Sequence, residues 1–220
     1  MEFKVFDIGL MNYKDALWFQ KEVFKAVHLG LEGPSLILCN HNPVITLGRT
    51  AKRENILFPE LELEKKGIEV YETERGGGVT YHGPGQLIAY PIFNLARLKK
   101  DIHWFLRELE HIVIDLLATF GIQAKKNPDL TGVWLEKGKI SSIGIAIKHW
   151  ITFHGLSINL KKDDLDNFQL IRPCGMDIRM TSLESELNKE VDIEEVKKEL
   201  IVKFKEIFNF TSVRYTDIRR

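Results

Sequence analysis

The spacing of apolar residues predicts three long helices in this chain. Between positions 13 and 29 apolar side chains recur at helical intervals, which predicts an early amphipathic helix. A longer apolar stripe follows Asp101, a common helix N-cap, and ends at Gly121, a typical helix terminator. A third helix is predicted after Asp192, because Glu195 stands three residues on, as in a capping box.

Most of the remaining apolar residues alternate with period two, which predicts β-strands. SLILCNHNPVITLG reads as strand, turn, strand, with Cys39 ending the first strand. GVWLE and ISSIGIAI read as a hairpin, and QLIAYPIFNL as a strand ended by Pro91. In WITFHGLSINL the alternation slips, which predicts a β-bulge near His154 and Gly155. Helices and mostly antiparallel strands in separate blocks are typical of an α+β fold.

Composition narrows the class of protein. The chain has 220 residues, 44% of them hydrophobic, and no linker or repeat, so we expect one domain spanning residues 1–220. Its 31 basic and 31 acidic residues balance, so the total charge gives no indication of binding to nucleic acid or to a membrane surface. The N-terminus has no signal-peptide pattern, and no apolar run is long enough to span a bilayer. We therefore expect a cytoplasmic protein.

The stretch RGGGVTYHGPGQ, residues 75–86, holds five glycines. Such loops can cradle phosphate, but GxxxxGK[ST] is absent, and a strand pattern follows instead of a helix. A hairpin loop would explain the glycines, although it would not explain why Arg75, Tyr81, His82 and Gln86 crowd around them. The histidines form no close Cys/His cluster, so we expect no metal site.

The two cysteines have different surroundings. Cys39 ends an apolar run and is expected to be a small buried residue, whereas Cys174 stands between Pro173 and Gly175 in a loop setting. A nucleophilic cysteine needs a nearby cation or base, and Lys139, just past a hairpin turn, is a candidate. An incidental loop thiol and an ordinary surface lysine remain the alternatives.

Four motifs, taken together, point to a known family. RGGGVTYHGPGQLIAYP, GKISSIG, FHGLSINL and RPCG occur in that order and resemble the lipoyl(octanoyl) transferases over about residues 75–175. This resemblance implies transfer of octanoyl from acyl carrier protein to a lysine of lipoyl domains, through a cysteine thioester and without a cofactor. The implied acceptors are the E2 subunits of 2-oxoacid dehydrogenases and the glycine cleavage H protein.

The resemblance also implies roles for individual residues. Cys174 corresponds to the acyl-accepting thiol and Lys139 to its partner. The acyl pocket would be lined by Arg75, Gly76, Gly77, Gly78, Val79, Thr80, Tyr81, His82, Ser142, Ile143, Gly144, Gly155, Leu156 and Ser157. The implied fold is an α+β domain whose mixed, largely antiparallel sheet is packed by helices, as in biotin and lipoate protein ligases. The chain departs from the family pattern at Ala146, where relatives commonly carry arginine, and in the polar residues Ser141, Ser142 and Ser157.

Two other functions are weighed against the transferase. An ATP-dependent lipoate or biotin ligase would share the fold but needs no cysteine, and a non-catalytic acyl-carrier-binding module would need neither Cys174 nor Lys139. Because the implied protein partners are typically acidic, we also expect a basic rim near the pocket. Its candidate residues are Arg49–Glu54, Lys148, Lys161 and Lys162.

Overall fold

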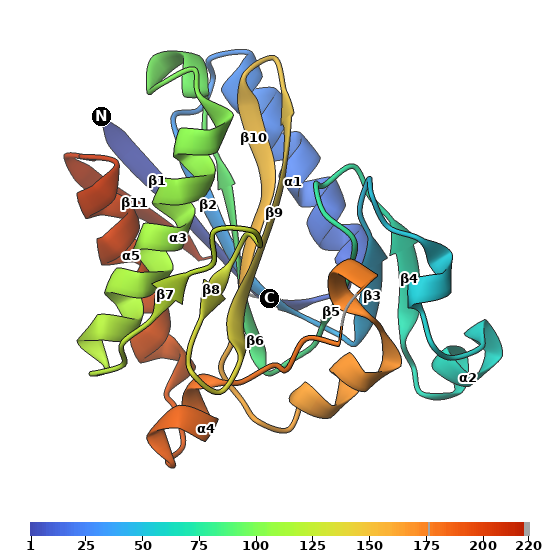
Figure 1. Cartoon of the computed structure of the whole chain (residues 1–220). Helices are drawn as coiled ribbons and strands as arrows, with labels where there is room; N and C mark the ends of the chain where they lie inside the picture. Colours follow the sequence, from blue (N-terminus) through green and yellow to red (C-terminus); the bar gives the residue numbers. More distant parts are fainter. Residues whose placement is uncertain (176, 218–220) are drawn as a thin grey trace.

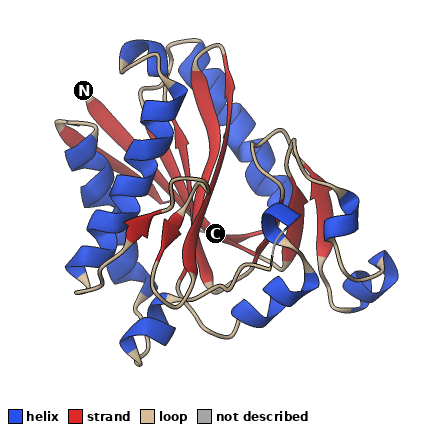
Figure 2. Ribbon diagram, in the orientation of Figure 1, coloured by secondary structure: helices blue, strands red, loops and turns tan. Residues whose placement is uncertain are grey.

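The computed structural model describes residues 1–175 and 177–217, and only the backbone of Cys174 and Asp217. It contains a mixed eight-stranded sheet, a second sheet of three strands, and helices on both faces of the large sheet (Figures 1 and 2). The expected α+β fold, with a mixed and largely antiparallel sheet, is confirmed. The elements are β1 (Glu2–Met11), α1 (Tyr13–His28), β2 (Ser35–His41), β3 (Val44–Leu47), η1 (Arg53–Asn55), α2 (Glu60–Lys65), β4 (Glu69–Glu72), β5 (Val79–His82), β6 (Gln86–Ile92), η2 (Leu95–Arg97), α3 (Ile102–Thr119), β7 (Lys125–Lys126), β8 (Val133–Trp134), β9 (Lys139–Lys148), β10 (Ile151–Asn159), η3 (Leu165–Leu170), η4 (Pro173–Gly175), α4 (Leu183–Leu187), α5 (Ile193–Ile207) and β11 (Ser212–Asp217).

The large sheet has the strand order β11-β1-β2-β6-β10-β9-β8-β7. β1 pairs in parallel with both β11 and β2, whereas every pair from β2 to β7 is antiparallel. The small sheet has the order β4-β3-β5 and stands to one side with α2 (Figure 1).

Alternate residues of the large sheet supply two hydrophobic layers. In β2, Leu36 and Leu38 join the cluster that contains α3 and α5, whereas Ile37 and Cys39 join the cluster that contains α1. Figure 1 shows α3 and α5 together on one face of the sheet and α1 on the other. Both faces of the central strands are therefore covered, and the predicted burial of Cys39 is confirmed.

The three predicted long helices are present, and local capping explains where two of them begin. The side chain of Asp101 accepts a hydrogen bond from the Trp104 N–H at the start of α3, and that of Asp192 accepts one from the Glu194 N–H at the start of α5. Gly121, with φ of 74°, follows the end of α3. The predicted hairpin is formed by β8 and β9.

The β-bulge predicted in β10 is wrong. Pairing with β9 keeps one register from Ile151 opposite Lys148 to Ile158 opposite Ser141. The slip in apolar alternation coincides instead with His154, which has a positive φ of 56° within the continuous strand. Every residue of β10 is buried, so apolar parity along the strand does not identify one inward face.

Two strand ends also differ from the sequence prediction. β2 continues past Cys39 to His41, and the two strands of SLILCNHNPVITLG enter different sheets instead of pairing. β6 runs through Pro91 to Ile92, with Pro91 opposite Leu36. Proline lacks a backbone N–H but still supplies a carbonyl, and here that carbonyl accepts a hydrogen bond from the Thr152 hydroxyl.

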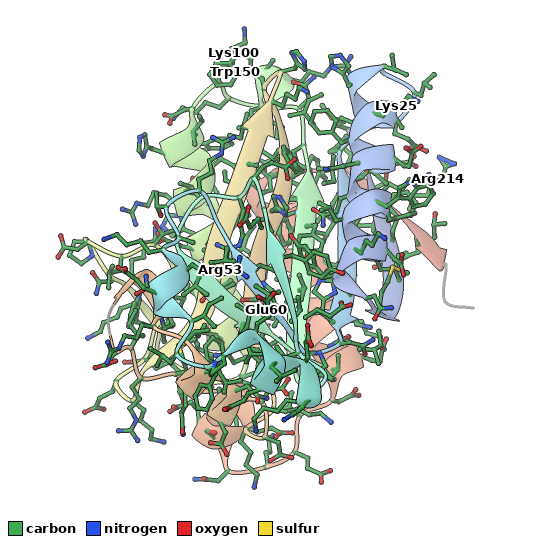
Figure 3. The ribbon with its side chains drawn as sticks, turned by 90° about the vertical axis from the view of Figure 1, so that its right-hand side faces the viewer. Lys25, Arg53, Glu60, Lys100, Trp150 and Arg214 are labelled. Atoms are coloured by element: carbon green, nitrogen blue, oxygen red, sulfur yellow. The ribbon has the colours of Figure 1, made fainter. Side chains whose placement is uncertain are left out.

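The small sheet packs on α2 and η3 through a third hydrophobic cluster, which includes Ile45, Leu63 and Phe168. An ion pair of 2.9 Å between Arg53 and Glu60 joins η1 to α2 on the exterior of this layer (Figure 3). Among the described residues, no helix has the length and apolar composition needed to cross a bilayer.

Candidate active site

A cavity of about 450 Å3 lies where the glycine-rich loop meets strands β9 and β10. The loop and β5 supply Arg75, Gly76, Gly77, Gly78, Val79, Thr80 and His82; β9 supplies Lys139, Ser142, Ile143, Gly144 and Ile145; and β10 supplies His154, Gly155, Leu156 and Ser157. Further lining comes from Tyr13, Thr46, Ile88, Tyr90, Ile102, Leu106, Asp129, Leu130, Thr131 and Pro173. Much of this lining is apolar side chain or bare backbone, which suits an aliphatic chain.

The guanidinium of Arg75 holds the glycine-rich loop in place from within. The side chain is buried, and it donates to the carbonyl oxygens of Thr46, Gly76 and Gly78 at 2.6, 3.1 and 2.9 Å. It also donates twice to the Thr46 hydroxyl. A planar fork with five donors can satisfy several carbonyls at once, so Arg75 fixes the loop on β3.

The glycines let backbone segments approach one another around the cavity. A Cβ on Gly144 would lie 2.8 Å from the Gly76 carbonyl oxygen, and one on Gly48 would collide with the Gly77 carbonyl oxygen. Gly77 itself has φ of 87°. At Gly76, by contrast, a Cβ would meet only the Ile145 carbonyl oxygen, at 3.5 Å. Gly48 and Gly144 therefore let the backbone of the glycine-rich stretch approach closely, whereas Gly76 within the stretch leaves space at the cavity wall.

Lys139 is buried at the cavity wall, with 5% of its surface exposed, and is not the exposed hairpin lysine of the simpler alternative. Its ammonium donates to the Thr131 carbonyl oxygen at 2.9 Å and lies 5.2 Å from the centre of the Trp134 ring. Both contacts stabilise a positive charge that has been withdrawn from water.

The backbone around Cys174 is anchored on both sides. The Arg172 N–H donates to the Asn55 carbonyl oxygen at 2.8 Å, just before η4. After η4, the Lys139 N–H donates to the Arg179 carbonyl oxygen at 2.9 Å, and the Thr181 N–H donates to the Lys139 carbonyl oxygen at 3.0 Å. The side chain of Cys174 lies outside the described part of the structure, but its neighbour Pro173 lines the cavity.

Two buried histidines near the cavity are held in definite tautomers. His82 Nδ1 lies 2.9 Å from Gln86 Oε1, an acceptor, so Nδ1 carries the proton. His41 Nδ1 donates to the Met11 carbonyl oxygen at 2.9 Å, which leaves Nε2 to accept from the Tyr90 hydroxyl at 2.7 Å. Burial lowers the pKa of His82 to about 3, with His41 adding to the effect, and burial lowers the pKa of His41 to about 4.

His154 and Tyr13 bring polar atoms without a hydrogen-bond partner to the cavity. Both are 2% exposed, and neither His154 Nε2 nor the Tyr13 hydroxyl has a hydrogen-bond partner among the described residues, although His154 Nε2 lies 3.9 Å from Glu74 Oε2. The backbone N–H of His154 donates to Gln20 Oε1 at 2.9 Å. Burial, reinforced by Arg75, lowers the pKa of His154 to about 4, and burial raises the pKa of Tyr13 to about 12. The lining histidines His82 and His154 are therefore uncharged at neutral pH.

Nearly all of the predicted pocket residues line this one cavity, with Tyr81 as the exception. The Tyr81 ring packs 5.6 Å from Phe168 in the third cluster, and its hydroxyl accepts from the Asn167 amide at 2.9 Å. Sequence reasoning missed Thr46 and Tyr13, which come from β3 and α1. Nothing in the local sequence marks them, because their place in the site follows from sheet pairing and helix packing.

The basic rim near the cavity stays a prediction, and its candidate residues lie in different parts of the fold. Lys148 stands at the end of β9, three residues beyond Ile145, which lines the cavity. It adjoins the turn that carries Trp150, near the top of Figure 3. Arg49, Lys161 and Lys162 are exposed.

Among the described residues, no group of three His, Cys, Asp or Glu side chains could hold a metal ion.

Comparison with known proteins gives consistent matches. Residues 12–205 match the family model described as the lipoyl protein ligase A/B catalytic domain. An octanoyltransferase of Thermoanaerobacter sp. (strain X514) is 44% identical over 207 residues, covering 93% of this chain and 90% of the relative. An octanoyltransferase of Geobacter sp. (strain M21) is 40% identical over 199 residues, covering 90% and 93%.

Solved structures share the fold at low sequence identity. Lipoate-protein ligase A bound with ATP is 20% identical with a TM-score of 0.83, covering 99% of this chain and 90% of that protein. A bipartite lipoate protein ligase of Thermoplasma acidophilum, described with its E2 lipoyl domain, is 18% identical with a TM-score of 0.75, covering 100% and 88%. The biotin protein ligase of Aquifex aeolicus is 11% identical with a TM-score of 0.56, covering 94% and 69%. The expected likeness to the lipoate and biotin ligase fold is confirmed.

Proposed function

Because the chain belongs to the octanoyltransferase family, we propose that it transfers octanoyl from acyl carrier protein to a lysine of lipoyl domains through a thioester on Cys174. The acceptors are the lipoyl domains of 2-oxoacid dehydrogenase E2 subunits and the glycine cleavage H protein. Residues 1–220 act as one acyltransferase domain, and no nucleotide takes part. The named relatives are acyltransferases, which favours this function over the ATP-dependent ligases that share the fold.

The relation between Lys139 and the Cys174 segment carries the proposal. Lys139 is buried at the cavity, and its backbone holds the chain that leaves η4 through hydrogen bonds to Arg179 and Thr181. Pro173, the residue before Cys174, lines the same cavity. A lysine buried beside a cysteine-bearing segment is a suitable partner for a thiolate nucleophile.

In the first step, the Cys174 thiolate attacks the carbonyl carbon of the octanoyl thioester. The Lys139 ammonium favours the thiolate, because an opposite charge nearby stabilises the ionised form. A bond forms between Cys174 Sγ and the acyl carbon, and the bond to the phosphopantetheine sulfur breaks. The departing sulfur takes a proton from Lys139, which leaves the lysine neutral.

In the second step, the neutral amine of the acceptor lysine attacks the enzyme thioester. Its free pKa is near 10.4, so only a small fraction is neutral in water at physiological pH. When its nitrogen bonds to the acyl carbon it becomes positively charged, and it then passes one proton to neutral Lys139. Cys174 leaves as the thiolate. Both groups return to their starting states, and conversion of thioester to amide supplies the driving force.

The octanoyl chain occupies the cavity beside the glycine-rich loop. Gly76, Gly77, Gly78, Val79, Thr80 and His82, with Ser142, Ile143, Gly144, Gly155, Leu156 and Ser157, form its walls. Arg75 acts by holding the loop. Tyr81 is not assigned to the acyl pocket, because its side chain packs in the third cluster.

An assay of the two donor chemistries tests this function. The protein is incubated with a lipoyl domain and either octanoyl-acyl carrier protein alone or free octanoate with ATP, and octanoylation of the lipoyl domain is followed by mass spectrometry. We expect transfer from the carrier without ATP and no pyrophosphate exchange with octanoate. Transfer only from octanoate with ATP would identify a ligase, and binding of the carrier without any transfer would identify the non-catalytic module.

Lys139 variants test its two roles separately. Arginine keeps the charge but cannot practically release a proton. In Lys139→Arg the Cys174 thiolate is still favoured and the departing sulfur can take a proton from water, but no neutral base accepts the proton of the acceptor amine, so this variant should retain more of the acylation step than of the transfer step. Lys139→Ala should acylate slowly at neutral pH and recover partly at higher pH, where the thiolate forms without its partner. An undiminished acylation rate in Lys139→Ala would remove this lysine from the mechanism.

A further inference from the structure

A carboxylate on α3 is fully buried close to the cavity wall. Glu110 is 0% exposed, and Arg107 donates to its Oε2 at 2.7 Å from a side chain that is itself 47% exposed. Its Oε1 accepts the backbone N–H of Gly132 at 3.0 Å. Burying a carboxylate is costly even when both oxygens accept hydrogen bonds, so a buried glutamate at this position calls for a role that offsets the cost.

The explanation lies in a single peptide group. The Gly132 N–H donates to Glu110, and the Thr131 carbonyl oxygen accepts a hydrogen bond from the Lys139 ammonium. This N–H and this carbonyl belong to the same peptide group, Thr131–Gly132. In a trans peptide the two groups point in opposite directions, so this peptide connects the carboxylate on one side with the ammonium on the other. Lys139 and Glu110 are thus linked through one rigid, planar group.

Gly132 has the conformation and the space that this link needs. Its φ is 130°, and a Cβ at this position would lie 2.5 Å from both Lys139 Cε and the Ser141 carbonyl oxygen. The absent side chain therefore leaves room for the Lys139 side chain to pass across the peptide.

We propose that Glu110 is a positioning residue for Lys139 and acts through the Thr131–Gly132 peptide. This inference rests on the proposed role of Lys139 in acyl transfer. A carboxylate acceptor polarises the peptide, which makes the Thr131 carbonyl oxygen a stronger acceptor for the ammonium. Without the carboxylate, the peptide is free to turn and the ammonium loses both its position and part of its stabilisation.

Other charged groups around Lys139 determine how the test is designed. On α3, Arg107 pairs with Glu110, and the Glu110 charge also acts on Lys126 of β7. Asp129 lines the same cavity as Lys139, and the Arg179 carbonyl oxygen accepts the Lys139 backbone N–H. A direct effect of the Glu110 charge must therefore be separated from an effect through the peptide. Glutamine keeps an oxygen acceptor without charge, whereas methionine of similar size removes both, so the two variants separate these effects.

The first experiment measures Lys139 itself, independently of catalysis. Wild-type protein, Glu110→Gln and Glu110→Met are labelled with acetic anhydride across a pH series, and acetylation of Lys139 is quantified by mass spectrometry with exposed Lys21 as internal reference. We expect the pH midpoint to fall by about one unit in Glu110→Gln, a tenfold change, and further in Glu110→Met. An unchanged midpoint overturns the proposal, and equal shifts in both variants indicate a direct charge effect and overturn the peptide link. Thermal denaturation identifies a misfolded variant. If Glu110→Met does not fold, Glu110→Leu, which also removes both the charge and the acceptor, takes its place, and an unchanged midpoint in Glu110→Gln overturns the proposal in either case.

The second experiment asks whether Glu110 acts on the reaction through Lys139. Glu110→Gln should slow acylation of Cys174 roughly tenfold, the effect expected from loss of a charged hydrogen bond. In a Lys139→Ala background the same substitution should change the rate less than about twofold. An equal loss in both backgrounds indicates a general structural role and overturns the proposal.

Asp164→Asn is the matched control. Asp164 also accepts a glycine N–H, that of Gly85 at 2.5 Å, but it does not line the cavity. Its substitution should have the same effect on the rate with and without Lys139; a dependence on Lys139 like that of Glu110 would overturn the specific link. If wild-type protein shows no octanoyl transfer, the proposed function fails, while the labelling experiment still decides the relation between Glu110 and Lys139.

Discussion

A single methyl group on Gly132 should disturb the site more than any other change of its size that we consider. The residue has φ of 130°, and the new Cβ in Gly132→Ala would lie 2.5 Å from Lys139 Cε and from the Ser141 carbonyl oxygen. The carbonyl belongs to β9 and is held in the sheet, so the lysine side chain and the Thr131–Gly132 peptide must move. We therefore expect both a loss of stability and a displaced ammonium.

The loss of stability and the loss of acylation rate in Gly132→Ala can be estimated separately. Backbone strain at a positive φ costs about 1–3 kcal/mol, and overpacking costs about 1–3 kcal/mol more. For a chain of this size each kcal/mol lowers Tm by about 2–4 °C, so a fall of roughly 5–20 °C is expected. Displacement of the ammonium by about 1 Å should slow acylation on the order of a hundredfold.

Gly121→Ala is the control, because Gly121 also has a positive φ, of 74°, but a Cβ there would meet nothing within 4 Å. It should lose about 1–2 kcal/mol of stability and keep its activity. Thermal denaturation and single-turnover acylation of both variants at a temperature where both are folded give the comparison. Equal activity of Gly132→Ala and Gly121→Ala would refute the reasoning.

Three further outcomes follow from the site. Gly76→Ala should fold normally yet narrow the cavity, so shorter acyl chains should be preferred in a competition between octanoyl and hexanoyl carriers; an unchanged preference would contradict the assignment of this wall. Cys39→Ala should cost about 1 kcal/mol of stability and little activity, since burial raises the pKa of that thiol and keeps it unreactive; a folded but inactive variant would count against Cys174 as the nucleophile. The folded-state pKa values of His41, His82 and His154 lie below the unfolded value near 6.5, so the stability that comes from their neutral forms is present above pH 6.5 and is lost as the pH falls toward 4. His41 alone accounts for roughly 3 kcal/mol of the free energy of unfolding across that range. A free energy of unfolding that does not fall between pH 7.5 and pH 5 would contradict these pKa values.

Local sequence signals were sufficient for much of the fold. Asp101 and Asp192 cap the helices that their positions predicted, because capping depends on residues only two or three apart in sequence. The glycine-rich motif also identified its part of the site. Its glycines meet local needs that few other residues satisfy: Gly77 has φ of 87°, and a Cβ on Gly83 or Gly85 would lie 2.6 or 2.9 Å from Asp164 Oδ2.

Other parts of the site depend on contacts between distant segments, which local patterns do not encode. Glu110 occupies a helix position that reads as polar surface, yet it is buried because the loop before β8 folds over it. Thr46 belongs to the site only because β3 pairs with β5 beside Arg75. The predicted bulge near His154 failed because a strand covered on both faces has no polar side to define its alternation.

The thioester on Cys174 is the central claim, and intact-mass spectrometry tests it most directly. Wild-type protein is mixed with octanoyl-acyl carrier protein in the absence of any acceptor, alongside Cys174→Ala and Cys39→Ala. The account predicts one octanoyl group on wild-type protein and on Cys39→Ala, removable by hydroxylamine, and none on Cys174→Ala. A hydroxylamine-sensitive octanoyl group on Cys174→Ala, or transfer to a lipoyl domain by that variant at the wild-type rate, would contradict it.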